Sequence, residues 1–167
     1  MPKKIENIRE KLLNEARRQA KISGYGSVTV RSVAGACGLG TGTVYNYFPS
    51  KDMLIASFIL EDWEKSLSTM RSSSASGIER MELVYNELIS FVSDHDYIFA
   101  DSEAEKSFAS SFFKWHSQLR LQISETLLDE CNGDRFLSEF LSEAIVTWSG
   151  EGKPFSELSP IIIKLLK

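Results

Sequence analysis

The sequence predicts an all-α protein of about nine helices. Apolar residues recur every three or four positions through most of the chain, and the alternation typical of strands is almost absent. Short polar or glycine-containing breaks, such as residues 71–77 (RSSSASG) and 131–134 (CNGD), separate the periodic segments. A chain of 167 residues with 43% hydrophobic residues is large enough to bury a core in one or two domains.

The composition argues against several classes of protein. No apolar run approaches the roughly 20 residues that a membrane span needs, and the charged N-terminus is unlike a signal peptide. Cys37 and Cys131 lie far apart without metal-ligand or redox-motif spacing. We therefore expect both to be small apolar side chains in a reduced, cytoplasmic protein with no membrane association, bound metal or cofactor.

The charge is distributed unevenly along the chain. Residues 1–51 hold nine Lys or Arg and three Asp or Glu, which gives +6, whereas residues 52–167 hold ten and twenty, which gives −10. A basic head on an acidic body indicates a polyanionic partner for the head alone. Chance segregation of solvated charge is the alternative explanation.

The N-terminal segment predicts one long helix followed by two short ones. Apolar residues from Ile5 to Ala20 recur at helical spacing, with basic residues between them. Thr29 is a good N-cap for a second helix, which Gly38 ends. Leu39 follows as an apolar residue inside a turn, where such a residue usually fills the junction between two helices.

The segment CGLGTGTVYNYFPSK, residues 37–51, predicts a short helix over about residues 41–48. Val44 and Phe48 stand four residues apart and form its inward face, and Pro49 stops it. Two short helices joined by a tight turn form a helix-turn-helix motif. The second helix of that motif enters the DNA major groove and presents small or polar side chains there, which fits the weak helix formers of this segment.

The chemistry of the second short helix predicts how it contacts duplex DNA. Gly42 and the flanking threonines let the backbone approach closely, and the hydroxyl groups can reach phosphate oxygens or base edges. Lys51, near the start of the following helix, adds a phosphate contact supported by the positive end of that helix. The residues expected to contact DNA are Thr29, Thr41, Gly42, Thr43, Tyr45, Asn46, Tyr47 and Lys51. We assign residues 1–51 to this DNA-binding domain and residues 52–167 to a regulatory and dimerisation domain.

Residues 29–54, TVRSVAGACGLGTGTVYNYFPSKDML, resemble the DNA-binding domain of the TetR family of bacterial repressors. That family's run reads roughly Thr-x-x-x-Ile-Ala, Ala-Gly-Val-Ser, Gly-Thr-Leu-Tyr-x-His/Tyr-Phe and Ser-Lys-Glu-x-Leu, and residues 12–25 resemble its first helix. By this resemblance, Arg31 on the second helix reads a base. Gly40 stands where the family carries a capping Ser; glycine is a tolerable N-cap, and Thr41 is an alternative cap that would remove it from base reading.

The resemblance also implies a homodimer that leaves its near-palindromic operator when a small molecule binds. The predicted helices over about residues 134–150 and 155–166 correspond to the family's dimerisation helices. The expected interface residues are Phe136, Phe140, Trp148, Ile162 and Leu166. The expected pocket for a small hydrophobic effector is lined by Phe58, Trp63, Tyr85, Phe112, Trp115 and His116. For both sets the alternative is ordinary core packing.

Two rival functions follow from the sequence. His95 lies between Asp94 and Asp96 in a segment, residues 94–103, that we predict to be irregular, and this trio faintly resembles a metal or acid–base cluster. The chain has no Gly-rich phosphate loop, HExxH, GxSxG or CxxC, so we expect no enzyme and no catalytic residues. The remaining alternative is a DNA-binding helical protein that acts mainly through a protein partner and has no small-molecule pocket.

Overall fold

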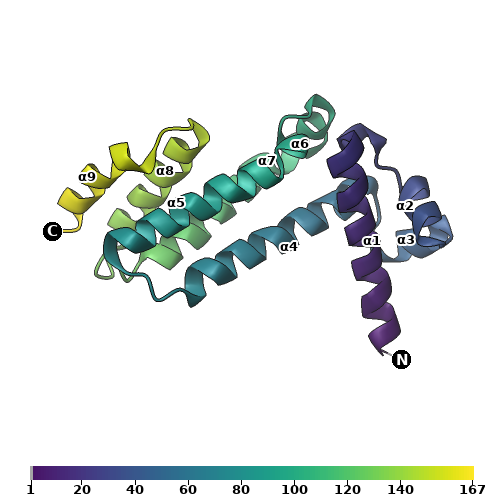
Figure 1. Ribbon diagram of the computed structural model, residues 1–167, viewed down its shortest axis with the longest axis horizontal. Helices are drawn as coiled ribbons and strands as arrows, with labels where there is room; N and C mark the ends of the chain where they lie inside the picture. The colour runs from purple at the N-terminus through teal and green to yellow at the C-terminus, as the bar shows by residue number, and fades with distance from the viewer. Residues whose placement is uncertain (1) are drawn as a thin grey trace. The chain divides into compact units, whose positions relative to one another are not determined.

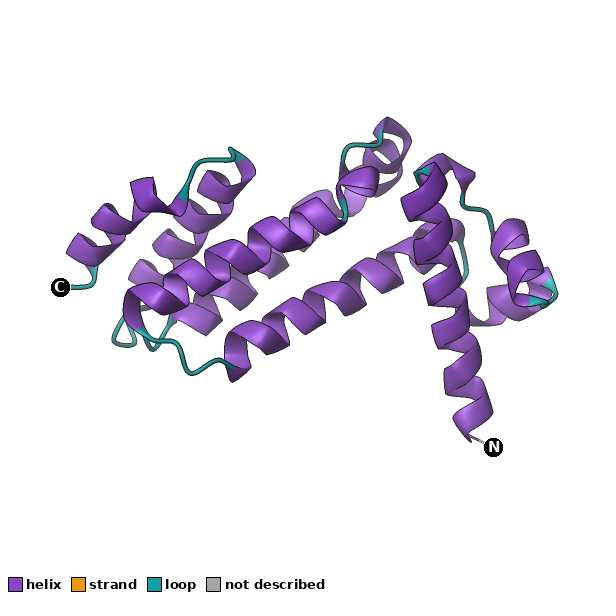
Figure 2. Cartoon of the chain, in the orientation of Figure 1, coloured by secondary structure: helices purple, strands orange, loops and turns teal. Residues whose placement is uncertain are grey.

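The computed structural model describes residues 2–167, with the side chains of residues 8–111 and 114–167, and its regular structure is helical throughout that part (Figures 1 and 2). The elements are α1 (Pro2–Ser23), the short 3-10 turn η1 (Tyr25–Ser27), α2 (Val30–Cys37), α3 (Thr41–Tyr47), α4 (Lys51–Ser72), α5 (Gly77–Asp94), α6 (Asp96–Phe99), α7 (Ser102–Leu127), α8 (Arg135–Gly150) and α9 (Phe155–Leu165). The predicted all-α fold is confirmed.

The chain forms two compact units. The first comprises Met1–Asp62 and Asp94–Ser110, and the second comprises Trp63–Ser93 and Ser111–Lys167. The long helices α4 and α7 each begin in the first unit and end in the second. The expected boundary at residue 51 therefore separates two helices rather than two compact units, and as a boundary between functions it stays a prediction.

The first unit packs α2 against α1 and α3 against α2 through small and branched apolar side chains. Leu12 and Ala16 of α1 are fully buried, as are Val33 of α2 and Val44 of α3. These positions recur at helical spacing, so each short helix gives one face to the core and leaves the others exposed. Burial of this single face stabilises helices that are too short to be stable in isolation.

The segment between α5 and α7 is more regular than its sequence indicates. We predicted an irregular segment over residues 94–103, but Asp96–Phe99 forms the single helical turn α6. Ile98 is buried and anchors this turn. The Asp101 carboxylate accepts hydrogen bonds from the backbone N–H groups of Glu103 (2.9 Å) and Ala104 (3.1 Å) and so begins α7. The prediction missed α6 because a single apolar residue shows no periodicity.

The second unit ends in two helices close to their predicted bounds. Asp134 caps α8 by accepting a hydrogen bond from the Leu137 N–H at 3.0 Å. The preceding turn places Asn132 (φ 54°) and Gly133 (φ 78°) in the left-handed region, which explains the break at CNGD. The core of this unit includes the buried residues Trp63, Leu67, Met70, Met81, Val84, Tyr85, Leu88, Ile123, Leu127, Leu141, Ile145, Leu158 and Ile162.

No helix among residues 2–167 combines the length and the apolar character needed to cross a bilayer.

Candidate nucleic-acid interface

Thr29 begins α2 through a reciprocal pair of hydrogen bonds. Its Oγ1 accepts from the Ser32 backbone N–H at 2.9 Å, and the Ser32 hydroxyl accepts from the Thr29 N–H at 3.0 Å. This capping box satisfies two donors that a helix N-terminus otherwise leaves unpaired. Thr29 is exposed as well, so its predicted DNA contact is compatible with its structural role.

The turn between α2 and α3 is held by its own backbone hydrogen bonds and by a contact from α1. Gly38 takes the left-handed conformation (φ 69°) that ends α2, and Leu39 N–H donates to the Ala34 carbonyl at 2.9 Å. The Lys11 ammonium on α1 donates to the Cys37 carbonyl at 2.9 Å, at the negative end of α2. These contacts hold the helix-turn-helix as one rigid piece on α1.

The predicted recognition helix forms as α3, one residue shorter than expected at its C-terminus. Gly40 is its N-cap, so Thr41 is the first helical residue and its side chain is not used for capping. Val44 and Phe48 are buried as predicted. The remaining side chains leave the core: Thr41, Gly42, Tyr45 and Asn46 are exposed, and Thr43 and Tyr47 are half-buried.

Arg31 adds a cation beside this surface. It is exposed on α2, and no hydrogen bond or ion pair to it is found among the described side chains. A guanidinium that keeps all its donors can form a bidentate contact to guanine or phosphate. The exposed set on α2 and α3 therefore offers hydroxyl, amide and guanidinium groups without an apolar patch.

Lys51 lies in a different environment from the other predicted contacts. Its Nζ lies 3.8 Å from the centroid of the Tyr25 ring and 3.6 Å from Oε1 of Glu103, and only 22% of its side chain is exposed. The Tyr25 hydroxyl donates to the Asp52 carboxylate. Sequence reasoning missed Tyr25 and Glu103 as members of this site, because Glu103 comes from α7, far away in the sequence.

The hydroxyl of Tyr25 stays protonated because of this packing. Burial, together with the hydrogen bond to Asp52, raises its pKa to about 12. The ring also meets Phe108 edge to face, with the ring centroids 5.9 Å apart. Tyr25 therefore provides a rigid neutral surface under the Lys51 ammonium.

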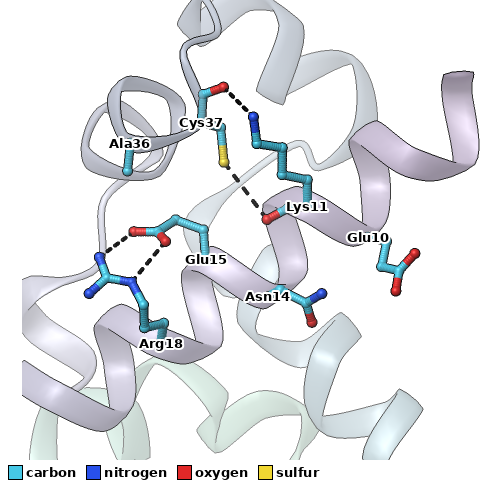
Figure 3. Close-up of a pocket in the computed structure, with 7 residues that line it drawn as sticks. All are labelled: Glu10, Lys11, Asn14, Glu15, Arg18, Ala36 and Cys37. Carbon is cyan, nitrogen blue, oxygen red and sulfur yellow. Dashed lines mark hydrogen bonds and ion pairs between the residues drawn. The ribbon is translucent and has the colours of Figure 1, made fainter.

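A separate polar groove of about 430 Å³ lies in the first unit (Figure 3). Its lining comes from α1 and α2 and consists of Glu10, Lys11, Asn14, Glu15, Arg18, Ala36 and Cys37. Figure 3 shows that Arg18 faces Glu15, with nitrogen–oxygen distances of 2.6 and 2.9 Å. This pairing lowers the pKa of Glu15 to about 2, and burial raises the pKa of the Cys37 thiol. None of the residues predicted for an effector pocket lines this groove.

The residues predicted to line an effector pocket are distributed over both units. Phe58 is buried in the first unit, and Cζ of Arg17 lies 5.2 Å from the centroid of its ring. In the second unit, the Trp63 indole N–H donates to Gln122 at 2.8 Å and the Tyr85 hydroxyl donates to the Lys153 carbonyl. The polar groups of Trp63 and Tyr85 are therefore hydrogen-bonded within the chain. The effector pocket stays a prediction.

Two aromatic residues and one histidine complete the predicted pocket set. Trp115 and His116 are half-buried on α7. Burial lowers the pKa of His116, and the charge of Arg120 lowers it further. The side chain of Phe112 lies outside the described residues.

The residues predicted for a dimer interface differ in exposure. Phe136 is 79% exposed and Phe140 is 51% exposed on α8, whereas Trp148 and Leu166 are half-buried. Ile162 is fully buried in its own unit, so it is core in this structure rather than interface. The exposed apolar residues of α9 are Ile161, Ile163 and Leu165. The apolar face of α9 is wide and includes the buried Ile162 as well as the exposed Ile161 and Leu165, so the sequence alone does not tell which part of that face is buried.

The cluster around His95 is structural. His95 is 3% exposed, and its Nε2 lies 3.2 Å from Oδ2 of Asp62, which also binds the Arg17 guanidinium at 3.0 and 3.1 Å. The neighbouring Asp94 and Asp96 are exposed. Within residues 8–111 and 114–167, no group of three His, Cys, Asp or Glu side chains is arranged to hold a metal ion.

A short polar helix that buries one face and is joined to a second short helix by a tight turn forms a helix-turn-helix motif, an arrangement by which many proteins bind DNA. The sequence family described as bacterial regulatory proteins, tetR family, matches residues 12–58, which span α2, α3 and the turn between them. Residues 12–58 are therefore similar to the N-terminal domain of this family of regulators.

Two curated relatives match the N-terminal half. The HTH-type transcriptional regulator UidR of Escherichia coli K12 is 29% identical over 90 residues, which cover 54% of this chain and 45% of UidR. The HTH-type transcriptional repressor KstR of Rhodococcus jostii RHA1 is 31% identical over 81 residues, which cover 48% of this chain and 38% of KstR. The chain therefore spans less than half the length of these two relatives.

Solved structures resemble almost the whole chain. The fatty acid degradation regulator FadR from Bacillus halodurans has a TM-score of 0.60 at 19% identity, covering 95% of this chain and 93% of FadR. A TetR/AcrR family regulator from Thermobifida fusca has a TM-score of 0.55 at 16% identity, covering 96% of each chain. At these identities the similarity shows the fold alone: an N-terminal helix-turn-helix domain with a helical C-terminal domain.

Proposed function

We propose that this protein is a sequence-specific repressor that binds a near-palindromic duplex DNA operator as a homodimer and is released by a small hydrophobic effector. The observation that carries the DNA-binding part is the exposed face of α3 beside Arg31. Val44 and Phe48 hold the helix by one face, so the small and hydroxyl-bearing residues of the other faces are free to approach the major groove.

The residues of this interface divide by role. Thr41, Gly42 and Thr43 lie in the first turn of α3, where the recognition helix of such motifs meets base edges. Arg31 supplies the guanine contact, and each such bidentate contact contributes about 1–3 kcal/mol of discrimination. Tyr45, Tyr47 and Lys51, together with the flanking Thr29 and Asn46, position the protein on the phosphate backbone.

A homodimer is proposed because near-palindromic operators mirror the two-fold symmetry of the proteins that bind them. The exposed Phe136 and Phe140 of α8 and the exposed apolar residues of α9 support an interface there. Large apolar side chains exposed on one pair of helices indicate an interaction surface. Repression, rather than activation, is supported by the name of the relative KstR.

The effector is proposed from the name of a structural neighbour and from the chemistry of the second unit. The name of the structural neighbour FadR refers to fatty acid degradation, and a hydrophobic effector would suit the apolar core of the second unit. The alternative is that the protein acts through a protein partner without a pocket. The hydrogen bonds of Trp63 and Tyr85 to groups of the same chain favour that alternative.

The proposal is tested by selection from a pool of random duplex DNA at two salt concentrations, followed by sequencing of the bound molecules. We expect an enriched near-palindrome with two half-sites and an affinity that falls steeply with salt. Arg31→Ala should weaken binding by about 1–3 kcal/mol and relax the selected sequence at one position. Arg71→Ala, which removes the same charge near the end of α4, should leave the selected sequence unchanged. Selection that enriches no sequence would refute specific recognition.

A further inference from the structure

The first turn of α7 brings an acidic side chain to the predicted DNA-binding surface. The Glu103 carboxylate lies 3.6 Å from the Lys51 ammonium, which is the proposed phosphate contact at the start of α4. Lys51 also lies against the Tyr25 ring, so its ammonium has an anionic and an aromatic partner within the chain. Both residues belong to the first compact unit.

We propose that Glu103 competes with DNA phosphate for Lys51, so that the contact between α7 and α4 weakens DNA binding. This inference rests on the proposed function. A carboxylate and a phosphate both accept charge-assisted hydrogen bonds from an ammonium group. When Lys51 turns toward a phosphate, it leaves Glu103, and the loss of this ion pair opposes binding.

The local structure leaves room for the Glu103 carboxylate beside Lys51. Asp101 caps α7 through the backbone N–H of Glu103, which fixes the first turn of the helix. Gly26 provides the space for the carboxylate, because a Cβ atom at this position would lie 3.1 Å from Oε2 of Glu103. An alanine at position 26 would therefore press on the acidic group. The contact is built by three separate segments of the unit.

The exposures of the two partners indicate which one is displaced by solvent more easily. The side chain of Glu103 is 65% exposed, whereas that of Lys51 is 22% exposed. Ion pairs that are largely exposed contribute modestly and are screened by salt. We therefore expect Glu103 to tune DNA affinity by about two- to fivefold rather than to abolish binding.

The position of Glu103 also depends on a helix that extends beyond the first unit. α7 begins at Ser102 and continues to Leu127 in the second unit. A change that shifts or frays the first turn of α7 would free Lys51 for phosphate, and a change that orders it would withdraw Lys51. The first turn of α7 therefore controls how strongly Lys51 is engaged within the first unit.

The test measures the affinity of the full chain for a mixed-sequence duplex DNA by fluorescence anisotropy at low and at moderate salt. The variant is Glu103→Gln, and the matched control is Glu105→Gln, which removes the same charge from the same turn of α7. Glu105 is exposed, and no ion pair to it is found among the described residues. Both changes are repeated in a Lys51→Gln background.

We expect Glu103→Gln to bind about two- to fivefold more tightly than Glu105→Gln at low salt, with a smaller difference at moderate salt. The difference should vanish in the Lys51→Gln background. Equal affinities for the two variants, or a difference that persists without Lys51, would overturn the proposal while DNA binding by the wild type still supports the proposed function. If the wild type does not bind duplex DNA at all, the proposed function fails and this inference fails with it.

Discussion

Two pairs of helices, α2 and α3 in the first unit and α8 and α9 in the second, differ in the chemistry of their exposed surfaces. In the first unit, α2 and α3 expose hydroxyl, amide and guanidinium groups and keep their apolar residues inside. In the second unit, α8 and α9 expose Phe136, Phe140, Ile161, Ile163 and Leu165. A polar surface of weak helix formers suits a hydrated polyanion, whereas an exposed apolar surface suits another protein surface. The difference is consistent with the proposal that α2 and α3 bind DNA and that α8 and α9 form a dimer interface.

The largest effect is expected from a charge placed on the apolar surface of the second unit. Phe136→Asp should weaken the proposed homodimer by about 2 kcal/mol or more, because a carboxylate would be buried without a partner. Because Phe136 is 79% exposed in the single chain, the variant should keep its fold. Analytical ultracentrifugation measures the dissociation constant, and circular dichroism checks the helix content.

The matched control for that change is in the first unit. Ile22 on α1 is 68% exposed, so Ile22→Asp adds the same charge at a similarly exposed apolar residue. We expect it to leave the association unchanged. Equal weakening by both changes would mean that net charge, and not the surface of α8, controls association.

The next effect concerns glycines in the exposed helices of the first unit. Gly42 in α3 and Gly35 in α2 are both helical and exposed, and a Cβ atom on either would meet nothing within 4 Å. Alanine at either position should therefore stabilise the unit by about 0.5–1 kcal/mol. Only Gly42→Ala should also weaken DNA binding, because only Gly42 is predicted to approach the major groove.

Urea denaturation and DNA binding by the two glycine variants separate stability from recognition. A gain in stability by both variants with lost affinity in Gly42→Ala alone would show that the glycine serves the DNA contact. Unchanged affinity in both would place α3 farther from the groove than proposed.

The predictability of the two units also differs. The helix-turn-helix could be predicted because its signals are local: the cap at Thr29, the left-handed Gly38 and the apolar Leu39 lie within a few residues of one another. The contact between Lys51 and Glu103 could not, because it joins segments that are distant in the sequence and depends on tertiary packing. Short-range signals therefore predicted the helix-turn-helix, but they did not predict the ion pair between Lys51 and Glu103.

In the second unit, the helices could be predicted but their buried faces could not. α9 contains three consecutive isoleucines, of which Ile162 is buried and the flanking two are exposed. The sequence shows the apolar face of this helix, but that face is wide, and its pattern does not tell which part of it is buried. Likewise, the aromatic spacing that suggested a pocket at Trp63 and Tyr85 is equally typical of core residues with satisfied polar atoms.

A smaller effect is expected from removing single tyrosine hydroxyl groups in the two units. Tyr85→Phe should lower the free energy of unfolding by about 0.5–1.5 kcal/mol, because the buried hydroxyl donates to the Lys153 carbonyl. Tyr45 is 54% exposed on α3, so Tyr45→Phe should leave stability unchanged and weaken DNA binding. Urea denaturation and anisotropy measure the two quantities, and the reverse pattern would contradict the division of roles between the units.

The smallest effect concerns pH. Burial lowers the pKa of His116 in the folded chain below its ordinary value of 6.5. Between these two values the unfolded chain binds more protons, so the stabilisation is present above about pH 6.5 and is lost as the pH falls through the folded value. The wild type should therefore lose more free energy of unfolding between about pH 7 and about pH 5 than His116→Gln.

The matched control for the pH effect is Glu15 in the first unit. The hydrogen bond from Arg18 lowers the pKa of Glu15 to about 2, so this carboxylate does not titrate between about pH 7 and about pH 5 in the folded chain. Glu15→Gln should consequently show the same loss of stability as the wild type over that range. Urea denaturation at the two pH values measures all three proteins. An equal pH dependence of His116→Gln and the wild type would mean that His116 is as well solvated in the folded chain as in the unfolded chain, and that the helix surface around it is open to water.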